Sequence, residues 1–405
     1  MESIRIQLPS HIHTTVPLPT SKSESNRALI IQALSQAPIT LSNLSTARDT
    51  QTMQALLQSE DPIWNVKDAG TTMRFLTAFA AATQKDRILT GTARMQERPI
   101  RILVDALHQL GAQIEYLKEV GYPPIHIRMQ GQALQGGKVS IRGDVSSQYI
   151  SALLMIAPTL AGGLTVEITH SIGSRPYIEM TLELMAHFGI QYEWVGNHIH
   201  IPPQAYQANS YAIEADWSAA SYWFSIAAIA QEAEIELLGL KLQSWQGDQR
   251  ILALIKAFGL QASPSPSGFI IQKIKGFVPQ KKILAIDFSH IPDLAQTFAV
   301  MALAKGIPLY MTGLESLRIK ETDRIAALQN ELAKFGGSMK AYEKGFLVSG
   351  HFQPSTQPIA TYHDHRMAMS FAPLAILQPY LDIKHPQVVQ KSYPDFWQHL
   401  SMLST

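Results

Sequence analysis

The sequence predicts an α/β protein of two domains, in which buried helices form the core and short strands connect them. At 405 residues the chain is longer than one hydrophobic core usually fills, so two domains are the default expectation. A pattern of amphipathic helix, glycine and short strand recurs four times along it. A second set of helices is apolar on nearly all sides. These three observations together predict the fold class.

Composition narrows the functional class. Hydrophobic residues make up 46% of the chain, and its net charge of +1 gives no overall field to attract nucleic acid or an anionic membrane. Any anion site must therefore be local. The absence of cysteine excludes disulfides, thiolate zinc sites and cysteine nucleophiles. Residues 1–8 alternate like a strand rather than a signal peptide, and no apolar stretch is long enough to span a bilayer, so we expect a cytoplasmic enzyme or binding protein.

The recurring pattern closes each time on a glycine that follows a leucine or phenylalanine. The four positions are Gly111, Gly189, Gly259 and Gly336. They fit the position just beyond a helix end, where a left-handed backbone is needed. Their spacings of 78, 70 and 77 residues suggest one supersecondary unit copied along the chain.

The second set of helices is expected to be buried, because a helix that is apolar all round has no face for water. The segments are residues 28–34, 73–82, 149–157, 219–230, 294–304 and 367–377, each preceded by a polar cluster. Alternating strands such as 138–142 and 164–168 link them into βαβ units around parallel helices. If the polar helix starts converge, they focus positive potential on one cleft.

The chain has no low-complexity linker between its halves. Residues 263–268, rich in serine and proline, predict a hairpin loop between strands. The two halves of the repeat series meet near residues 210–215, where we expect the main domain boundary.

The first polar helix start, residues 19–27, has the composition of an anion site. Several hydroxyl side chains and the cations Lys22 and Arg27 stand where an apolar helix begins. A helix start offers unpaired N–H groups and a positive dipole end to a phosphate or carboxylate. Taken alone, the segment equally fits a serine-capped helix with a solvated lysine.

Residues 318–324 form a dense charge cluster of three cations and two carboxylates. Glu321 lies between Lys320 and Arg324, which suits a general acid or base beside phosphate-binding cations. The alternative is a charged capping segment, with Thr322 or Asp323 as the cap of a helix at 325–335.

Three other helix starts carry candidate groups. Asp293 would cap the helix that follows it, although a carboxylate there would also suit deprotonation of a hydroxyl. The two histidines of residues 363–365 lack further ligands at zinc-like spacing, so no metal is expected. Arg366 fits a carboxylate or phosphate clamp. Arg98 precedes Pro99, which we expect to be the first residue of a helix; a solvated arginine is the alternative.

Motifs of several common enzyme classes are absent. The chain has no nucleotide-binding P-loop, no convincing dinucleotide glycine fingerprint and no nucleophilic serine elbow. Kinase, dehydrogenase and hydrolase hypotheses therefore lack support.

Together these motifs resemble the EPSP synthase family, the 3-phosphoshikimate 1-carboxyvinyltransferases, in order and almost from end to end. The matching segments are Ser21-Lys22-Ser23 with Asn26-Arg27, Ala69-Gly70-Thr71, Glu97-Arg98-Pro99, Ser146-Ser147-Gln148, Lys320-Glu321-Thr322-Asp323-Arg324, Asp364-His365-Arg366, and Lys391 before Tyr393-Pro394-Asp395. The resemblance implies a two-domain inside-out α/β barrel with three βαβαββ repeats per domain. It implies domains at residues 20–214 and at 1–19 with 215–405, and an active site in the cleft between them.

The resemblance also implies a role for each matching residue. Shikimate 3-phosphate would be bound by Lys22, Ser23, Arg27, Ser146, Ser147, Gln148, Ser174, Tyr177, Asp293 and Lys320. Phosphoenolpyruvate would be bound by Lys22, Gly70, Arg98, Gln148, Arg324, Arg366 and Lys391. No cofactor, metal, nucleic acid or membrane is implied, and a monomer is expected.

The implied reaction is an addition followed by an elimination. Asp293 would take the proton of the 5-hydroxyl as it attacks C2 of the enol, and Glu321 would protonate C3. The tetrahedral intermediate would then lose phosphate, with Lys22 stabilising the leaving group. Bringing two polyanions together needs cations at both phosphates and a closure that excludes water.

Four positions depart from the family pattern. Lys67-Asp68 replaces a common glycine-asparagine pair, Phe75 replaces a common proline, and Ser316 stands where an asparagine is frequent. The segment before Lys391 lacks a frequent cysteine.

Two alternatives remain. UDP-N-acetylglucosamine enolpyruvyl transferases share the fold and chemistry, but they usually carry a loop cysteine and a lysine-asparagine pair where Lys22-Ser23 stands. A non-catalytic phosphometabolite-binding protein is the other, although it would gain nothing from Asp293 and Glu321 beside phosphates.

Overall fold

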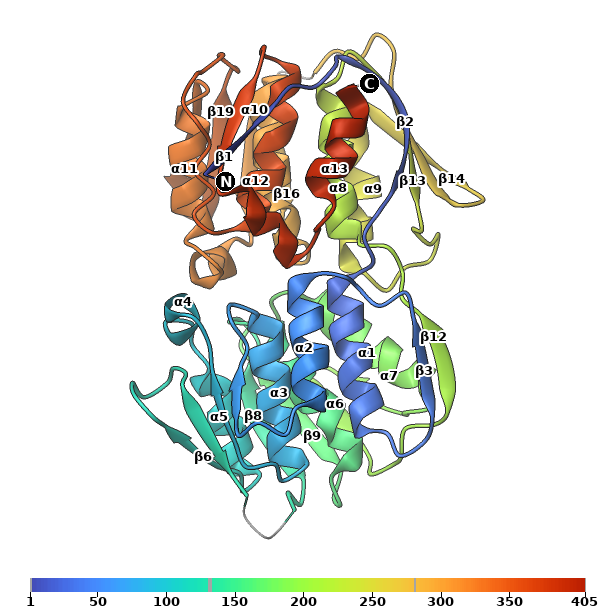
Figure 1. The fold of residues 1–405 in the computed structure, drawn as a ribbon, viewed down its shortest axis with the longest axis vertical. Coiled ribbons are helices and arrows are strands. Elements are labelled where there is room, and N and C mark those ends of the chain that lie inside the picture. The colour runs from blue at the N-terminus through green and yellow to red at the C-terminus, as the bar shows by residue number, and fades with distance from the viewer. Residues whose placement is uncertain (1, 130–132, 280–281, 405) are drawn as a thin grey trace. The chain divides into compact units, whose positions relative to one another are not determined.

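The computed structural model describes residues 2–129, 133–279 and 282–404, and the chain divides into two compact units. Unit 1 comprises residues 1–20 and 214–405, and unit 2 comprises residues 21–213 (Figure 1). The N-terminal segment belongs to unit 1 because strand β2 (His11–Pro17) pairs with β13 (Glu232–Leu238) along its whole length.

Unit 2 contains two four-stranded sheets and a two-stranded one, with helices between them. Its helices are α1 (Lys22–Leu34), α2 (Arg48–Gln58), α3 (Gly70–Ala82), α4 (Ala93–Gln96), α5 (Arg101–Gln109), α6 (Ser147–Ile156), the 3-10 turn η1 (Ala157–Thr159) and α7 (Arg175–His187). Its strands are β3 (Ile39–Ser42), β4 (Ile63–Asn65), β5 (Arg87–Thr90), β6 (Gln113–Tyr116), β7 (Ile125–Arg128), β8 (Gly137–Arg142), β9 (Leu164–Thr169), β10 (Glu193–Val195), β11 (His198–Ile201) and β12 (Asn209–Ala212).

Unit 1 has the same plan. Its helices are α8 (Trp217–Ile229), α9 (Ile251–Leu254), α10 (Ala295–Lys305), α11 (Arg324–Ala333), α12 (His365–Phe371) and α13 (Phe396–Ser401). Its 3-10 turns are η2 (Gly247–Arg250), η3 (Ile255–Phe258), η4 (Pro292–Leu294), η5 (Glu315–Ile319), η6 (Ala372–Ile376), η7 (Pro386–Lys391) and η8 (Met402–Ser404). Its remaining strands are β1 (Ser3–Ile6), β14 (Leu260–Ser265), β15 (Gly268–Lys273), β16 (Leu284–Asp287), β17 (Leu309–Thr312), β18 (Gly337–Tyr342), β19 (Gly345–Gly350) and β20 (Leu381–Lys384).

One pairing pattern recurs in all four of the four-stranded sheets. Two strands pair in parallel, and two further strands continue the sheet in antiparallel pairing. The strand orders are β4-β5-β7-β6 and β8-β9-β11-β10 in unit 2, and β2-β13-β15-β14 and β16-β17-β19-β18 in unit 1. The third sheet of each unit has two strands, β3 with β12 and β1 with β20. This repetition is the structural basis of the glycine spacing seen in the sequence.

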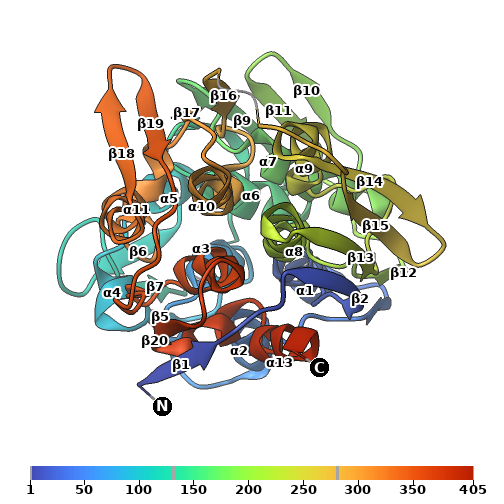
Figure 2. The same ribbon diagram turned by 90° about the horizontal axis from the view of Figure 1, so that it is seen from above.

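The predicted buried helices are confirmed, and they form the core of each unit. In unit 1, α10 packs against both α8 and α12, and Figure 2 views α8 and α10 nearly along their axes. In unit 2, α6 packs against α3 and α7. The sixth predicted segment, 367–377, is divided: α12 ends at Phe371 and continues as η6, because Pro373 has no N–H to extend an α-helix.

Five of the six predicted helices start earlier than the apolar pattern indicates, because the polar clusters form their first turns, whereas α10 starts one residue later, at Ala295. Ser21 caps α1 and Asp216 caps α8, each accepting a backbone N–H from the first turn. Ser146 and Asp364 do the same for α6 and α12. The polar residues are thereby fixed at the ends of buried helices rather than in mobile loops.

The predicted turns are also confirmed. The glycines that close the four repeats all have left-handed backbones, with φ of 95°, 87°, 82° and 78° in chain order. The predicted loop at 263–268 is the tight end of the β14–β15 hairpin, where Ser265 pairs with Gly268. Among the described residues, no helix is both long enough and apolar enough to cross a membrane.

Candidate active site

In unit 1, three carboxylates surround the guanidinium of Arg324, whose side chain is 2% exposed. Its Nε lies 2.7 Å from Asp364, and its two terminal nitrogens lie 3.0 Å from Asp293 and 3.0 Å from Glu321. Burial alone would lower the pKa of this guanidinium, but the three negative charges outweigh burial and raise it. Arg324 therefore stays charged and fixes the positions of the three carboxylates.

The Arg324 cluster is built from several elements. Asp323 caps α11 by accepting the N–H groups of Ile325 and Ala326, so Arg324 is the first residue of that helix. Asp364 caps α12, and Asp293 lies in the 3-10 turn η4. The starts of α11 and α12 and the turn η4 thus bring these charged side chains together in unit 1.

Asp293 does not cap the helix that follows it, so that structural prediction was wrong. The turn η4 continues directly into α10, whose N-cap position is occupied by Leu294 without a side-chain bond. The freed carboxylate lies between two arginines, 3.0 Å from Arg324 and 2.9 Å from Arg366. A carboxylate held in this way accepts hydrogen bonds and has its negative charge stabilised.

Arg366 and Lys391 complete the cations of this group. Arg366 also donates to the backbone carbonyl of Asp293 at 3.2 Å and to the hydroxyl of Tyr222 at 3.3 Å. Lys391, 1% exposed, places its Nζ 3.8 Å from Glu321. Lys320, at the end of η5, is half-buried. The cluster therefore offers cations for an anion next to carboxylates that can move a proton.

Sequence reasoning missed a buried carboxyl in unit 1. Asp248, in η2, accepts the hydroxyl hydrogen of Ser218, and Arg366 donates to the same hydroxyl at 3.4 Å. Burial, with the nearby charge of Asp293, raises the pKa of Asp248 to about 7. A lone aspartate in a turn has no local signature, and the pairing spans 30 residues, so no sequence signal pointed to it.

In unit 2, the start of α1 combines a cap with a cation. Ser21 accepts the N–H of Glu24 at 3.3 Å, and Lys22 is the first helical residue. The Lys22 ammonium lies 3.2 Å from Asp49, the second residue of the next helix, α2. The serine-capped helix is thus real, and the lysine lies at the positive end of its dipole.

Arg27 is buried among neutral acceptors. It donates to the Thr181 hydroxyl at 2.7 Å, to the Ser23 carbonyl at 2.9 Å and to the Tyr177 carbonyl at 3.2 Å. Burial lowers its pKa to about 10. Its guanidinium also lies 5.3 Å from the ring centroid of Phe75, one of the positions that departs from the family pattern. Arg27 therefore ties the start of α1 to α7.

Gly70 and Arg98 are in close contact. Gly70 begins α3, and a Cβ placed on it would lie 2.5 Å from a terminal nitrogen of Arg98. Arg98 is buried, donates to the carbonyl of Asp68 at 3.3 Å, and its Nε has no partner among the described residues. Pro99 is not the first residue of a helix as predicted, because Ile100 is the N-cap of α5. The segment before α5 is instead held by Tyr149, which donates to the carbonyl of Pro99 at 2.6 Å.

The start of α6 and the start of α7 present hydroxyl groups. Ser146 caps α6 by accepting the N–H of Gln148, whose side-chain amide reaches Thr71 at 3.2 Å. Ser147 is the first residue of that helix and is buried. Ser174 precedes α7 with a left-handed φ of 54° and makes no side-chain cap bond. Such conformations cost energy in a residue with a Cβ and are concentrated at functional sites.

The predicted residues fall into two groups, one in each unit. Unit 2 holds Lys22, Ser23, Arg27, Gly70, Arg98, Ser146, Ser147, Gln148, Ser174 and Tyr177; unit 1 holds Asp293, Lys320, Glu321, Arg324, Arg366 and Lys391. Ion pairs join five of the six in unit 1 into one network. In unit 2 the contacts form smaller separate groups, such as Arg27 with Ser23 and Tyr177, and Gly70 with Arg98.

Of the remaining departures, Asp68 accepts a hydrogen bond from Arg48 at 2.7 Å, and Ser316 lies within η5. The ion pair with Arg48 gives Asp68 a local structural role. Within the described part of the chain, no group of three or more His, Asp or Glu residues is arranged to hold a metal ion.

Comparisons with known proteins agree on one family. The sequence profile of EPSP synthase (3-phosphoshikimate 1-carboxyvinyltransferase) matches residues 6–60 and 56–400. A 3-phosphoshikimate 1-carboxyvinyltransferase from Bacteroides fragilis is 47% identical over 98% of this chain and 96% of its own length. One from Idiomarina loihiensis is 36% identical over 100% of this chain and 99% of its own. The structure of an EPSP synthase from Acinetobacter baumannii superposes with a TM-score of 0.78 at 21% identity, covering 100% of this chain and 98% of that one.

Proposed function

Because this chain belongs to the EPSP synthase family, we propose that the residue groups of its two units act on one pair of substrates. The reaction transfers the enolpyruvyl group of phosphoenolpyruvate to the 5-hydroxyl of shikimate 3-phosphate. Its products are 5-enolpyruvylshikimate 3-phosphate and phosphate, and it belongs to the shikimate pathway. The observation that carries the assignment of roles is the network in which two arginines and a lysine hold Asp293 and Glu321.

Phosphoenolpyruvate binding is proposed for the cations of unit 1 together with part of unit 2. Arg324, Arg366 and Lys391 are buried and already oriented, so they lose little freedom on binding an anion. In unit 2, the free Nε of Arg98 supports the same role, and Gly70 leaves room for its guanidinium. Gln148 and Lys22 would contact both substrates.

Shikimate 3-phosphate binding is proposed mainly for the helix starts of unit 2. The residues are Lys22, Ser23, Arg27, Ser146, Ser147, Gln148, Ser174 and Tyr177, joined by Asp293 and Lys320 of unit 1. The hydroxyls at the starts of α6 and α7 and the ammonium at the start of α1 are suited to a phosphate, because all three lie at positive helix ends.

The proton transfers are proposed for Asp293 and Glu321, two of the three carboxylates that share Arg324. Asp293 would accept the proton of the 5-hydroxyl as its oxygen attacks C2 of the enol. Glu321, with Lys391 at 3.8 Å, would deliver a proton to C3. As the C2–O bond to phosphate breaks, the Glu321 carboxylate would take a proton back from C3, which forms the C2=C3 double bond of the product, and Lys22 would stabilise the charge of the departing phosphate.

The remaining proposals concern organisation. Residues 20–214 and residues 1–19 with 215–405 would each form one enolpyruvyl transferase domain, and catalysis would require both. The protein would act as a monomer in the cytoplasm, with small-molecule partners and no cofactor. Sedimentation velocity at micromolar concentration tests the monomeric state, since a concentration-dependent dimer would contradict it.

The deciding experiment is phosphate release on mixing the protein with phosphoenolpyruvate and shikimate 3-phosphate. Release with this acceptor and none with UDP-N-acetylglucosamine is expected. Release with the UDP-sugar alone would reassign the acceptor, and none with either would leave a binding protein. Lys22→Ala should lose turnover and keep its circular dichroism spectrum, whereas the control Lys138→Ala, which breaks only an exposed pair with Glu167, should keep the wild-type rate.

A further inference from the structure

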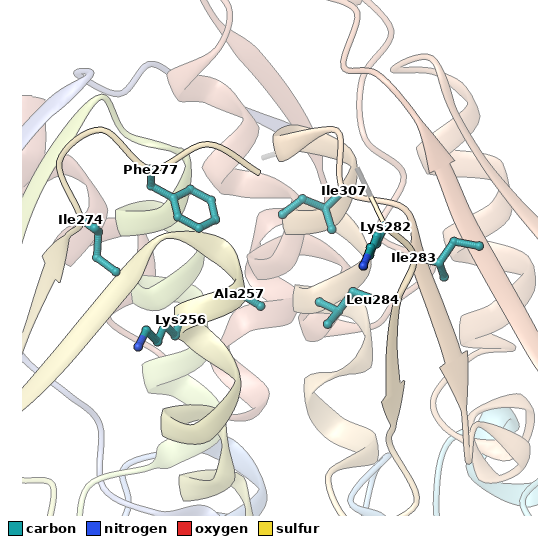
Figure 3. A pocket seen from close by; sticks show the side chains of 8 residues that line it. All are labelled: Lys256, Ala257, Ile274, Phe277, Lys282, Ile283, Leu284 and Ile307. Atoms are coloured by element: carbon teal, nitrogen blue, oxygen red, sulfur yellow. The ribbon is translucent and has the colours of Figure 1, made fainter. Parts of the chain in front are cut away.

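Unit 1 contains a cavity of about 520 Å³ that shares no lining residue with the candidate active site. It lies among η3, the end of β15, the start of β16 and the residues after α10, and Figure 3 shows its side chains. The described lining is Lys256, Ala257, Ile274, Phe277, Lys282, Ile283, Leu284 and Ile307. The volume is in the range of sites that hold small organic molecules.

Helix α10 separates this cavity from the proposed catalytic carboxylate. Asp293 precedes the first residue of the helix, and Ile307 follows its last residue by two positions. A helix of 11 residues is about 16 Å long, so the cavity and Asp293 lie at opposite ends of α10. A ligand in the cavity would not touch the residues to which we assign substrate binding.

The chemistry of the lining is that of an amphipathic anion site. The walls are apolar, yet the two charged members, Lys256 and Lys282, come from opposite sides of the cavity (Figure 3). None of the described lining residues is acidic, and neither lysine has an ion pair among the described residues. A ligand that fills the cavity would therefore meet apolar surface and positive charge together.

A second group of lysines, with Glu232 and Glu234 among its neighbours, lies beside Phe277. This residue also lines a broad basin, where Lys305 lies 5.6 Å from its ring centroid. Lys305 neighbours Lys273, whose ammonium donates to the carbonyls of Ala228 and Ala230 at the end of α8. Neither amine has an ion-pair partner among the described residues. Burial and the neighbouring Lys305 lower the pKa of Lys273 to about 7, as expected for uncompensated positive charge.

We propose that this cavity is a second ligand site that binds a small carboxylate with an apolar, ring-sized body. The body packs against Phe277, Leu284 and Ile307, and the carboxylate pairs with Lys256 or Lys282. A neutral apolar ligand would leave the lysines without a counter-charge, and inorganic phosphate would leave the apolar walls in contact with water. The proposal does not depend on the catalytic assignment above.

The test uses 1-naphthoate as the probe, with binding measured by isothermal titration calorimetry on the full chain without substrates. We expect saturable binding at one site. The neutral isostere 1-naphthalenemethanol should bind at least about tenfold more weakly, because it lacks the charge-assisted contacts. Equal affinity for the two probes would overturn the proposal.

Two double variants, each of which removes two lysine charges, test whether 1-naphthoate binds at this cavity. Lys256→Gln/Lys282→Gln should weaken 1-naphthoate binding by about tenfold or more, whereas the control Lys340→Gln/Lys344→Gln, on the exposed β18–β19 hairpin, should change it less than twofold. All four lysines are exposed, so neither variant is expected to disturb folding. Equal weakening by both variants, or by neither, would refute a site at this cavity.

Discussion

Replacing Arg324 by methionine tests whether the carboxylate cluster is held by one buried cation. Methionine has a similar length and no charge, so the change removes three charge-assisted hydrogen bonds and little packing volume. Two of the carboxylates keep other cations, since Asp293 retains Arg366 at 2.9 Å and Glu321 retains Lys391 at 3.8 Å. Asp364, which is 0% exposed, loses the shortest of the three bonds.

The expected loss follows from counting stranded charges. Removing one partner of a buried ion pair costs about 3–5 kcal/mol, and one carboxylate, Asp364, is left without a strong cation. We therefore expect Arg324→Met to lower the free energy of unfolding by about 3–5 kcal/mol at pH 7 rather than by three times that amount. Domain stabilities are about 5–15 kcal/mol, so the variant should still fold.

The assay is urea unfolding followed by tryptophan fluorescence. Trp217 and Trp223 are fully buried in unit 1 and report on it. The matched control is Arg318→Met, because Arg318 is 52% exposed and its pair with Asp323 should contribute no more than about 1 kcal/mol. Adding Asp364→Asn to Arg324→Met should restore part of the lost stability. Equal effects of Arg324→Met and Arg318→Met, with no recovery in the double variant, would refute the reasoning.

Three further predictions concern other groups. The pKa of Asp248 is raised from 3.8 to about 7, so between these pH values the folded protein keeps a proton that the unfolded chain releases, and stability falls as pH rises. The stability of Asp248→Asn relative to wild type should therefore increase by about 2–4 kcal/mol between pH 4 and pH 8. A stability difference in urea unfolding that does not change with pH would contradict this. Gly70→Ala should displace the Arg98 guanidinium without unfolding the protein and raise the KM for phosphoenolpyruvate at least about tenfold; an unchanged KM would separate Arg98 from that substrate. Lys305→Met removes the like charge beside Lys273 and should stabilise the protein by about 1 kcal/mol below pH 7, where the half-buried Lys273 is charged. No such gain is expected near pH 10, where Lys273 is neutral in the folded state of both wild type and variant. NMR titration should show the pKa of Lys273 rising above about 7.

The helices of the core were predictable because their signal is local. A segment that is apolar all round must be buried, and its first polar residue marks where it begins. The strand pairing was not predictable in this way, because β2 pairs with β13 across more than 200 residues of intervening chain and no local pattern encodes that register. The repeat glycines indicated that a unit was copied, but not which strands it paired.

The candidate site shows the same division between local and distant information. Motifs identified Asp293, Arg324 and Arg366 as chemical groups, but their mutual contacts join residues 31 and 73 positions apart. The capping role predicted for Asp293 was wrong because Pro292 starts a 3-10 turn that runs into α10 without a cap. Because of this turn, the carboxylate can pair with the two arginines instead of capping a helix. The N-capping rule therefore failed at the residue that is proposed to accept a proton.

The distribution of charge between the units explains why the proposed chemistry requires both. In unit 1 the cations Arg324, Arg366 and Lys391 are each paired with carboxylates, so this group places anion-binding cations directly beside groups that can move a proton. In unit 2, Arg27 and Arg98 have no ion pair with a described carboxylate, and the hydroxyl-bearing helix ends add further positive potential. Unit 2 is therefore suited to binding polyanions, and unit 1 to binding an anion at a place where a proton can be moved. A binding protein would need only the cations and helix ends of unit 2. Burying the carboxylates of unit 1 with their cations costs desolvation free energy, which is expected where those carboxylates take part in the proposed proton transfers.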